Sequence, residues 1–404
     1  MTPLAFLLSL ERLGMKFGLE NMQTICAALD HPERAFRSVI VAGTNGKGSV
    51  TAMTSAALAA AGFRSARYTS PHLERLEERF VIAEREVATA DLEQAAATVQ
   101  QVVERLVRER ALEQLPTFFE CATAIAFELF RRAAVEVAVV EVGLGGRLDA
   151  TNVLTPMAAA ITSIDFDHKE LLGETLAAIA REKAGVIKSE MTVVRGPMPD
   201  DAADVIAQVC RERGARLVDA SRDALAVAPA LEGAHQQANA AVAVSLLKEL
   251  RAFDIAMPDA AIHAGLTGVR WPGRLERFAW RGADVLLDAA HNPAGARALA
   301  QYLDDKGWRD VAIVLGVMRD KDATGMLAPL LPYATALVCT TPPNPRAMPA
   351  LELAALAASL APSDVRVSSI DDPAAALAAA CQHAARVVAA GSIFLIGPLR
   401  GILR

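Results

Sequence analysis

The stretch SVIVAGTNGKGS, residues 38–49, predicts the element around which the rest of the chain is arranged. Val39 to Val41 is a short β-branched run, typical of a buried strand. Three glycines then flank a lysine, and Val50 to Ala61 is a helix-forming run that Gly62 ends. A strand, a glycine loop and a helix in this order predict a phosphate-binding loop, because backbone N–H groups and a helix N-terminus both attract anions.

The loop residues have separate predicted tasks. Lys47 would neutralise phosphate oxygens, and Ser49 would offer its hydroxyl to a magnesium ion. The pattern departs from the Walker motif, since Gly48 separates the lysine from the hydroxyl residue, and a tight turn that caps an ordinary helix is the plain alternative. The nucleotide contacts predicted here are Gly43, Thr44, Asn45, Gly46, Lys47, Gly48 and Ser49.

Length and composition restrict the class of protein. A chain of 404 residues is long for one core, so two domains are expected. The net charge of -6 argues against a nucleic-acid surface, and the five cysteines, with no paired metal-ligand spacing, fit reduced thiols of a cytoplasmic protein. The uncharged run from Ala323 to Pro345 is interrupted by prolines, so we expect no membrane span. The apolar run from Met1 to Leu10 is too short and has no basic residues before it, so we expect no secretory leader.

Apolar runs alternate with helical patterns through the first part of the chain. Strands are expected at Val135 to Val142, Ala158 to Ile164 and Thr192 to Arg195, with helices between them. This alternation predicts a doubly wound α/β sheet, whose ligands gather at the carboxyl ends of the strands. The glycine loop, Glu141 and the pair Asp167-His168 all lie at such ends.

A second alternation follows the turn signal WPGR at residues 271–274. Its expected strands and helices include a helix from Pro373 to Ala389 and a final strand from Ser392 to Ile396. We place the domain boundary near residue 280, which gives a larger α/β domain at 1–280 and a smaller α/β domain at 281–404.

Taken in order, these segments resemble the folylpolyglutamate synthase and dihydrofolate synthase family of the Mur ligase superfamily. The resemblance covers nearly the whole chain. Its blocks are KFGLE at 16–20, the glycine loop, SPHL at 70–73, FE at 119–120, 141–152, TSI at 162–164 with DH at 167–168, REKAG at 181–185, HQ at 235–236 with Asn239, PGR at 272–274, Asp288 with HNP at 291–293, and GS at 391–392. The resemblance implies that residues 1–280 form an ATP- and pterin-binding domain of the P-loop ATPase type, like the central Mur ligase domain. Residues 281–404 would form a Rossmann-like α/β ligase domain.

The chemistry that the resemblance implies is ATP-driven amide formation. ATP phosphorylates the carboxylate of dihydropteroate, of a reduced folate or of both, and the amino group of L-glutamate attacks the acyl phosphate. The implied catalytic residues are Lys47, Glu141, His168 and Lys183. The implied ligands of two magnesium ions are Ser49, Ser70, Glu141, His168 and Lys183, the last as a carbamate. Without the family, His168 would be an ordinary loop histidine and Lys183 a surface lysine.

The resemblance also implies the remaining contacts. Asn239, Arg274, Asp288 and His291 match nucleotide contacts. The matches to pterin-binding segments are Phe17, Gly18, Leu19, Ser70, Pro71, His72, Phe118, Phe119, Glu120, Leu148, Asp149 and Ala150. Phe118 and Phe119 open a helix, where simple core packing is an equally good interpretation. A monomer is expected. Two alternatives remain open at this point: a Mur-type ligase for another carboxylate, and a catalytically silent ATP-binding regulator.

Overall fold

The computed structural model describes residues 2–14, 18–112, 114–223 and 225–404, and the chain forms two compact units. The first comprises Met1–Ile164, Glu174–Ala230 and Ala238–Val269, and the second comprises Asp165–Gly173, Leu231–Gln237 and Arg270–Arg404. The boundary expected near residue 280 falls inside the second unit, at the end of β9 (Glu276–Trp280). β9 belongs there because it pairs antiparallel with β10 (Ala283–Leu287).

The first unit holds a sheet whose described strands run in the order β4-β3-β2-β5-β1-β6-β7-β8. From β2 to β8 all neighbours are parallel, and β3 and β4 extend the β2 edge antiparallel. The strand bounds are β1 Arg37–Ala42, β2 Ser65–Tyr68, β3 Phe80–Ile82, β4 Arg85–Glu86, β5 Val137–Glu141, β6 Ala158–Ile161, β7 Thr192–Arg195 and β8 Arg216–Asp219.

Strand β1 lies at the centre of this sheet, between β5 and β6. Its last four residues and all of β5 are buried, as expected of parallel strands covered on both faces. Val41 pairs with Glu141 on one side and with Ala160 on the other. Residues that follow these three strands therefore meet at one edge of the sheet.

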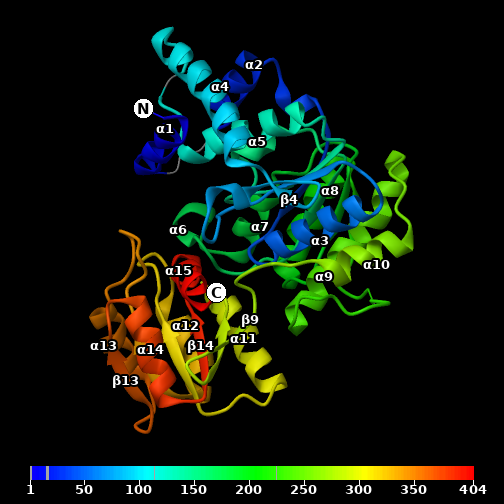
Figure 1. Cartoon of the computed structure of the whole chain (residues 1–404). Coiled ribbons are helices and arrows are strands. Elements are labelled where there is room, and N and C mark those ends of the chain that lie inside the picture. The colour runs from blue at the N-terminus through cyan, green and yellow to red at the C-terminus, as the bar shows by residue number, and fades with distance from the viewer. Residues whose placement is uncertain (1, 15–17, 113, 224) are drawn as a thin grey trace. The chain divides into compact units, whose positions relative to one another are not determined.

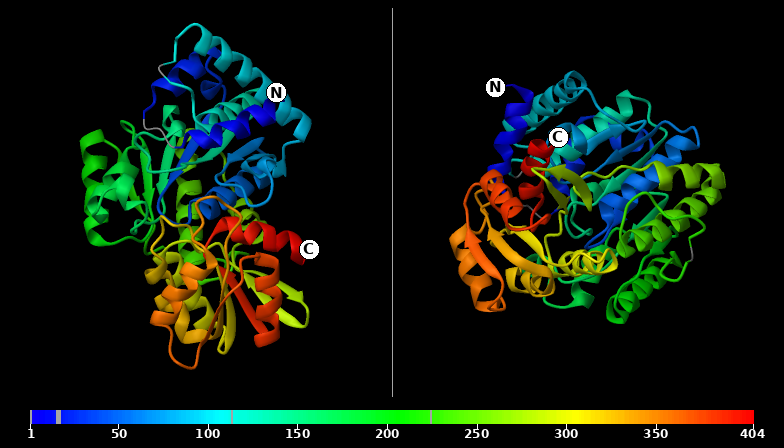
Figure 2. Two further views of the ribbon diagram at one scale, coloured as in Figure 1. Left: turned by 90° about the vertical axis from the view of Figure 1, so that its left-hand side faces the viewer. Right: turned by 60° about the horizontal axis from the view of Figure 1, so that its bottom comes forward.

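Helices surround this sheet, and those that the structure describes are α1 Pro3–Ser9, α2 Glu20–Ala28, α3 Lys47–Ala60, α4 Thr89–Arg108, α5 Phe118–Arg132, α7 Leu176–Ala184, α8 Asp200–Arg213, α9 Ala234–Glu249 and α10 Asp259–Gly268. Helices α1, α4 and α5 pack on one another, as Figures 1 and 2 show. Short 3₁₀ turns are η1 Leu10–Leu13, η2 Pro32–Arg34, η3 Leu76–Arg79, η4 Ala150–Val153 and η5 Leu250–Phe253. The α10 backbone approaches α3 so closely that a Cβ on Gly265 would lie 2.5 Å from the Ala57 nitrogen.

The second unit holds a sheet whose described strands run in the order β13-β12-β11-β14-β10-β9, parallel except for β9. Its further strands are β11 Val311–Leu315, β12 Ala334–Cys339, β13 Arg366–Ser369 and β14 Arg386–Ala390. Its helices are α6 Lys169–Leu172, α11 Pro293–Asp305, α12 Ala323–Leu330, α13 Ala350–Leu360, α14 Pro373–His383 and α15 Ile393–Leu403, with a 3₁₀ turn η6 at Leu331–Tyr333. The expectation of two α/β sheets is confirmed.

Two predicted elements near the C-terminus are wrong. The helix predicted to reach Ala389 ends at His383, and β14 follows as a buried strand between β11 and β10. The predicted strand from Ser392 to Ile396 is instead the start of α15, because the Ser392 hydroxyl accepts a hydrogen bond from Phe394 N–H and caps that helix. Among the described residues, no helix combines the length and the apolar character that crossing a membrane requires.

Candidate active site

The glycine loop has the backbone shape that the sequence predicts. Gly43 has φ of 147° and Gly46 has φ of 86°, conformations that favour glycine. A Cβ on Gly43 would lie 2.0 Å from the Thr162 hydroxyl and 3.1 Å from the Thr162 nitrogen, so a side chain has no room there. Lys47 is the first residue of α3 and Ser49 lies buried in its first turn.

Residues after the neighbouring strand β6 hold this loop in place. Thr44 N–H donates to the Ser163 carbonyl at 2.7 Å, and Asn45 N–H donates to the Ser163 hydroxyl at 3.1 Å. The Thr162 hydroxyl donates to the Asn45 carbonyl at 2.6 Å. The loop is thus anchored through its backbone.

Two lysines converge on the carbonyl groups of the loop. Lys47 Nζ donates to the carbonyl oxygens of Gly43 at 3.1 Å and Thr44 at 3.2 Å. Lys183, buried near the end of α7, donates from Nζ to the Gly43 carbonyl oxygen at 2.9 Å. Burying a charged lysine is unfavourable unless its ammonium group is paired or hydrogen-bonded. Lys183 is therefore not a plain surface lysine.

Glu141 and Ser70 lie at the same edge, at the ends of β5 and β2. Ser70 N–H donates to Glu141 Oε2 at 3.2 Å, and Glu141 is buried. Among the described residues, no group of three or more histidine, cysteine, aspartate or glutamate side chains is arranged so that it could hold a metal ion by itself. A site with a single carboxylate and hydroxyl groups fits magnesium, which typically takes one or two carboxylates together with waters and substrate phosphates. The Lys183 ammonium only donates hydrogen bonds, so it would ligate a cation only as a carbamate.

Several predicted pterin-binding segments also meet in the first unit. His72 Nδ1 accepts a hydrogen bond from Arg79 Nε at 2.9 Å, and the Arg79 guanidinium lies 5.0 Å from the centre of the Phe118 ring. Burial and the charge of Arg79 lower the pKa of His72 to about 4. A Cβ on Gly143 would lie 2.5 Å from Phe119, so that ring rests directly on the loop after β5.

Two of the predicted pterin contacts, Glu120 and Asp149, accept hydrogen bonds from nearby backbone N–H groups. Glu120 accepts a hydrogen bond from Thr117 N–H at 2.7 Å and completes the capping box of α5. Asp149 accepts from Leu144 N–H at 2.9 Å and from Thr151 N–H at 3.0 Å. Burial raises the pKa of Asp149 in spite of these bonds. Phe17 lies outside the described residues, whereas Gly18, Leu19, Pro71, Leu148 and Ala150 lie within them.

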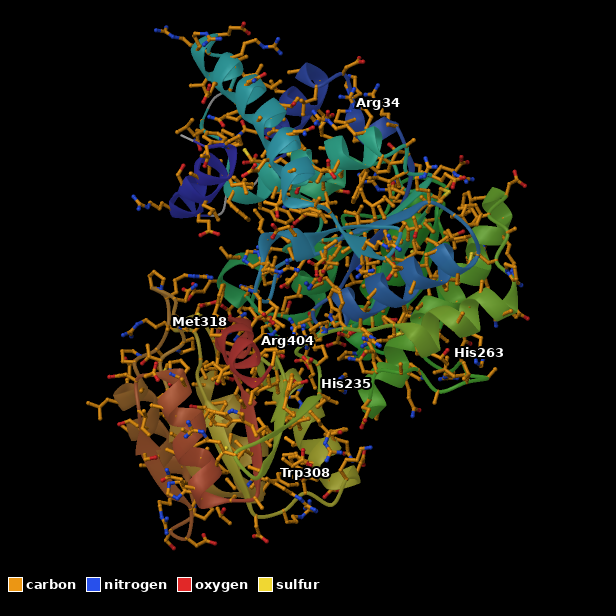
Figure 3. All side chains as sticks on the ribbon, viewed as in Figure 1. Arg34, His235, His263, Trp308, Met318 and Arg404 are labelled. Atoms are coloured by element: carbon orange, nitrogen blue, oxygen red, sulfur yellow. The ribbon has the colours of Figure 1, made fainter. Side chains whose placement is uncertain are left out.

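The predicted nucleotide contacts divide between the units. Asn239 belongs to the first, where a Cβ on Gly46 would lie 2.2 Å from its Oδ1. In the second unit, Asp288 is buried and accepts from Leu275 N–H at 3.0 Å and Ala290 N–H at 2.9 Å. Arg274 donates to the Ala289 carbonyl at 3.4 Å. Nearby in the same unit, His235 (Figure 3) has its pKa lowered by burial.

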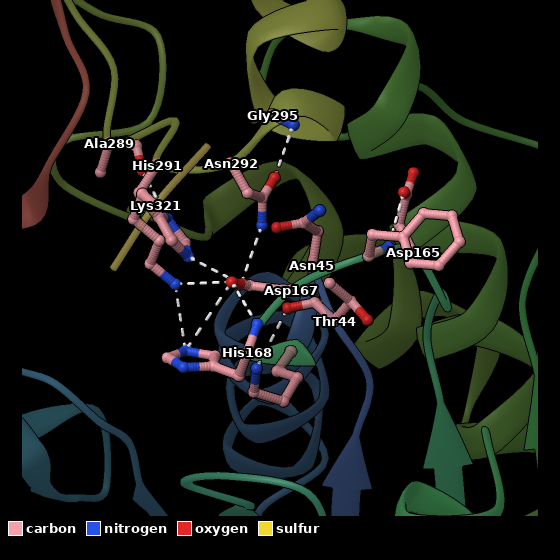
Figure 4. Close-up of polar contacts among 12 residues, drawn as sticks. Thr44, Asn45, Asp165, Asp167, His168, Ala289, His291, Asn292, Gly295 and Lys321 are labelled. Carbon is pink, nitrogen blue, oxygen red and sulfur yellow. Dashed lines mark hydrogen bonds and ion pairs between the residues drawn. The ribbon is translucent and has the colours of Figure 1, made fainter. Parts of the chain in front are cut away.

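His168 also belongs to the second unit, in a cluster around the carboxylate of Asp167 (Figure 4). Lys321 Nζ lies 2.6 Å from Asp167 Oδ1, and Asn292 Nδ2 donates to Asp167 Oδ2 at 3.1 Å. Burial alone would raise the pKa of Asp167, but the charges of Lys321, His168 and His291 lower it. Burial and the Lys321 ammonium lower the pKa of His291 to about 4.

The chain was compared with known proteins. It is 33% identical over 371 residues to the folylpolyglutamate synthase of Lacticaseibacillus casei, covering 85% of this chain and 86% of that protein. The chain belongs to the folylpolyglutamate synthase and dihydrofolate synthase family. The family resemblance stated from the sequence is therefore confirmed. The model of the Mur ligase glutamate ligase domain matches residues 273–396, within the second unit.

Some relatives of this family member are longer. It is 36% identical over 363 residues to the probable bifunctional folylpolyglutamate synthase/dihydropteroate synthase of Haloferax volcanii. The matched region covers 83% of this chain but only 42% of that protein. Among solved structures, the Mycobacterium tuberculosis folylpolyglutamate synthase complexed with ADP and AMPPCP matches with a TM-score of 0.89 and 33% identity, over 99% of both chains. The bifunctional enzyme from Yersinia pestis complexed with AMPPNP and a Mn ion matches with a TM-score of 0.85 and 32% identity, over 99% of this chain and 97% of that one.

The sequence analysis missed two residues of this family member that the structure makes prominent. Lys321 lies in the loop after β11, so the rule that ligands gather at the carboxyl ends of strands would have pointed to it. Arg79 ends η3 within a charged run, where a solvated side chain is the ordinary expectation. Nothing in the local sequence indicates that Arg79 is buried.

Proposed function

We propose that this protein is an ATP-dependent ligase that joins L-glutamate to the carboxylate of dihydropteroate, of a reduced folate or of both. ATP transfers its γ-phosphoryl group to the substrate carboxylate and leaves as ADP. The glutamate nitrogen then attacks the acyl carbon, loses a proton and displaces inorganic phosphate. We also propose that the protein acts in the cytoplasm and as a monomer.

The observation that carries the proposal is the anchored glycine loop at the end of β1, beside Glu141. Loop N–H groups and the start of α3 provide fixed positive charge for phosphate oxygens, which costs no reorganisation during the reaction. Lys47 is the first residue of α3, and its ammonium group adds further positive charge for the phosphate oxygens. In phosphoryl transfer, positioning and charge stabilisation supply nearly all of the catalysis.

The metal ligands proposed in the first unit are Ser49, Ser70, Glu141 and the carbamate of Lys183, and His168 is the metal ligand proposed in the second unit. Two bound magnesium ions would supply charge stabilisation for the phosphoryl group. Carbamate formation replaces the cation of Lys183 by an anionic oxygen donor of the kind that magnesium prefers. The buried position of this lysine at the Gly43 carbonyl supports the assignment, since its nitrogen already lies against the phosphate loop.

The proposed pterin contacts are the aromatic side chains of Phe118 and Phe119 together with His72 and the segment around Asp149. A flat ring stacks favourably on aromatic side chains, and a few polar groups suffice to read its edge. Arg79 donates its Nε–H to His72 beside Phe118, and pterin oxygens and nitrogens are acceptors for its other guanidinium N–H groups. Asn239, Arg274, Asp288 and His291 remain the proposed nucleotide contacts outside the glycine loop.

Phosphate release tests this proposal. The purified protein, with ATP and magnesium, should release phosphate only when both glutamate and a pterin carboxylate are present. Lys47→Ala should abolish the release, whereas Lys306→Met, which removes a half-exposed ion pair with Glu232, should not. Release with a cell-wall precursor in place of the pterin would favour a Mur-type ligase. No release with either pterin would favour an ATP-binding regulator.

A further inference from the structure

His168 adopts a backbone conformation that must be held by its surroundings. Its φ of 48° and ψ of 42° lie in the left-handed region, which side-chain-bearing residues adopt rarely. The backbone N–H of His168 donates to Asp167 Oδ1 at 3.0 Å. The Asp167 carboxylate therefore fixes the segment from which the imidazole ring projects.

The Lys321 ammonium contacts both of these residues. Its nitrogen lies 2.6 Å from Asp167 Oδ1 and 3.1 Å from His168 Nε2, as Figure 4 shows. An ammonium group can only donate, so His168 Nε2 accepts and the proton of the neutral ring is on Nδ1. The side chains of Lys321 and Asp167 are only 8% and 9% exposed, so water competes little for these contacts.

A cation bound through this nitrogen needs the same lone pair. Imidazole ligates metals as the neutral ring through its unprotonated nitrogen, and here Lys321 occupies that nitrogen. We propose that Lys321 is a placeholder cation, which holds His168 Nε2 until a divalent metal ion takes its position. This inference rests on the proposed function, because it takes His168 to be a metal ligand.

The surroundings of Asp167 favour such an exchange. Its carboxylate also accepts a hydrogen bond from Asn292 Nδ2 at 3.1 Å, and His291 Nε2 lies 3.7 Å from Oδ2. The hydrogen bond from the neutral Asn292 amide keeps the carboxylate ordered when the lysine leaves, and its negative charge remains beside His168 to attract the incoming cation. A buried carboxylate without any cation is unfavourable, which explains why a lysine occupies the place at rest.

The binding test compares three variants. Titrating MnCl₂ into protein saturated with AMPPNP, followed by calorimetry, gives the metal Kd without turnover. Lys321→Met removes the competing donor and should lower that Kd on the order of tenfold. Asp167→Asn should raise it, because the lysine remains and the attracting charge is lost. Lys306→Met removes a different lysine-carboxylate pair of the same unit and should leave the Kd unchanged.

The opposite signs separate the proposal from a folding defect, which would weaken binding in both cluster variants. Nitrogen NMR of the metal-free wild-type protein supplies a test without any variant: His168 should carry its proton on Nδ1 with Nε2 hydrogen-bonded. An Nε2-protonated ring, or equal Mn²⁺ affinities in wild type and Lys321→Met, would overturn the placeholder role alone. Absence of nucleotide-dependent Mn²⁺ binding in every form would overturn the proposed function as well.

Discussion

The ammonium nitrogen of Lys183 lies 2.9 Å from the carbonyl oxygen of Gly43, which joins helix α7 directly to the phosphate loop. Both residues lie in the first unit, and the lysine is only 4% exposed. A buried lysine beside a loop that attracts anions is well placed to become an anionic ligand by reaction with carbon dioxide.

Replacing Lys183 should therefore remove activity in a way that a small anion can restore. Lys183→Ala should lower kcat on the order of 100-fold or more, because the proposed metal ligand is lost. Acetate or formate should restore part of the rate, since either carboxylate can occupy the vacated space. Lys183→Arg keeps the positive charge but forms no carbamate, so it should stay inactive with acetate. A Lys183→Ala protein that is fully active without bicarbonate or short carboxylates would contradict this role.

The glycine loop gives a prediction with a matched control. Gly43→Ala combines an unfavourable φ with a Cβ that would meet Thr162, including its backbone nitrogen at 3.1 Å. Gly214 has φ of 63° but open space around it, so Gly214→Ala carries only the conformational cost of about 1 kcal/mol. Gly43→Ala should lose ATP binding measured by calorimetry, whereas Gly214→Ala should retain it. Equal ATP affinities in the two variants would show that the loop backbone does not form the nucleotide site.

Replacing Arg79 should change the KM for the pterin substrate and not the KM for ATP. If its buried guanidinium donates to the pterin ring, Arg79→Gln should raise the KM for the pterin substrate on the order of tenfold and leave the KM for ATP unchanged. Arg131→Gln, which removes a partly exposed ion pair with Glu128 on α5, is the control. Parallel increases in both KM values in Arg79→Gln would indicate a general structural role instead.

His72 predicts a pH dependence of stability. Its pKa of about 4 in the folded protein is below the ordinary value of about 6.5 that applies to the unfolded chain. Between these values the unfolded chain binds more protons, so the free energy of unfolding should fall as the pH falls from 6.5 towards 4. His72→Gln should flatten this part of the profile by on the order of 1 to 2 kcal/mol, measured by urea unfolding at several pH values. An unchanged profile would show that His72 titrates normally in the folded protein.

The parts of the fold that the sequence predicts correctly are those with a strong local signal. The β-branched run before Gly43 and the Val/Ala run before Glu141 are buried central strands because nothing else suits such residues. The alanine-rich region before Ala389 carries no such signal, since a helix and a buried strand are equally compatible with it, and tertiary pairing of β14 decides.

The site shows the same division. The positions of Lys47 and Glu141 in the fold could be predicted, because Lys47 begins the helix after the glycine loop and Glu141 ends a strongly apolar strand. Lys321 and Arg79 could not, because their importance comes from burial against residues distant in the sequence: Lys321 is 154 positions from Asp167. The capping bonds of Asp149 and Glu120 are local instead, and the spacing of Thr117 and Glu120 is the sequence pattern of a capping box.

The most direct test of the ligase assignment is product mass. The protein is incubated with ATP, magnesium and labelled L-glutamate, separately with dihydropteroate and with tetrahydrofolate, and the products are identified by mass spectrometry. We predict a product that carries one added glutamyl residue in an amide bond, formed together with one ADP and one phosphate. ATP binding without any glutamylated product from either substrate would contradict the assignment.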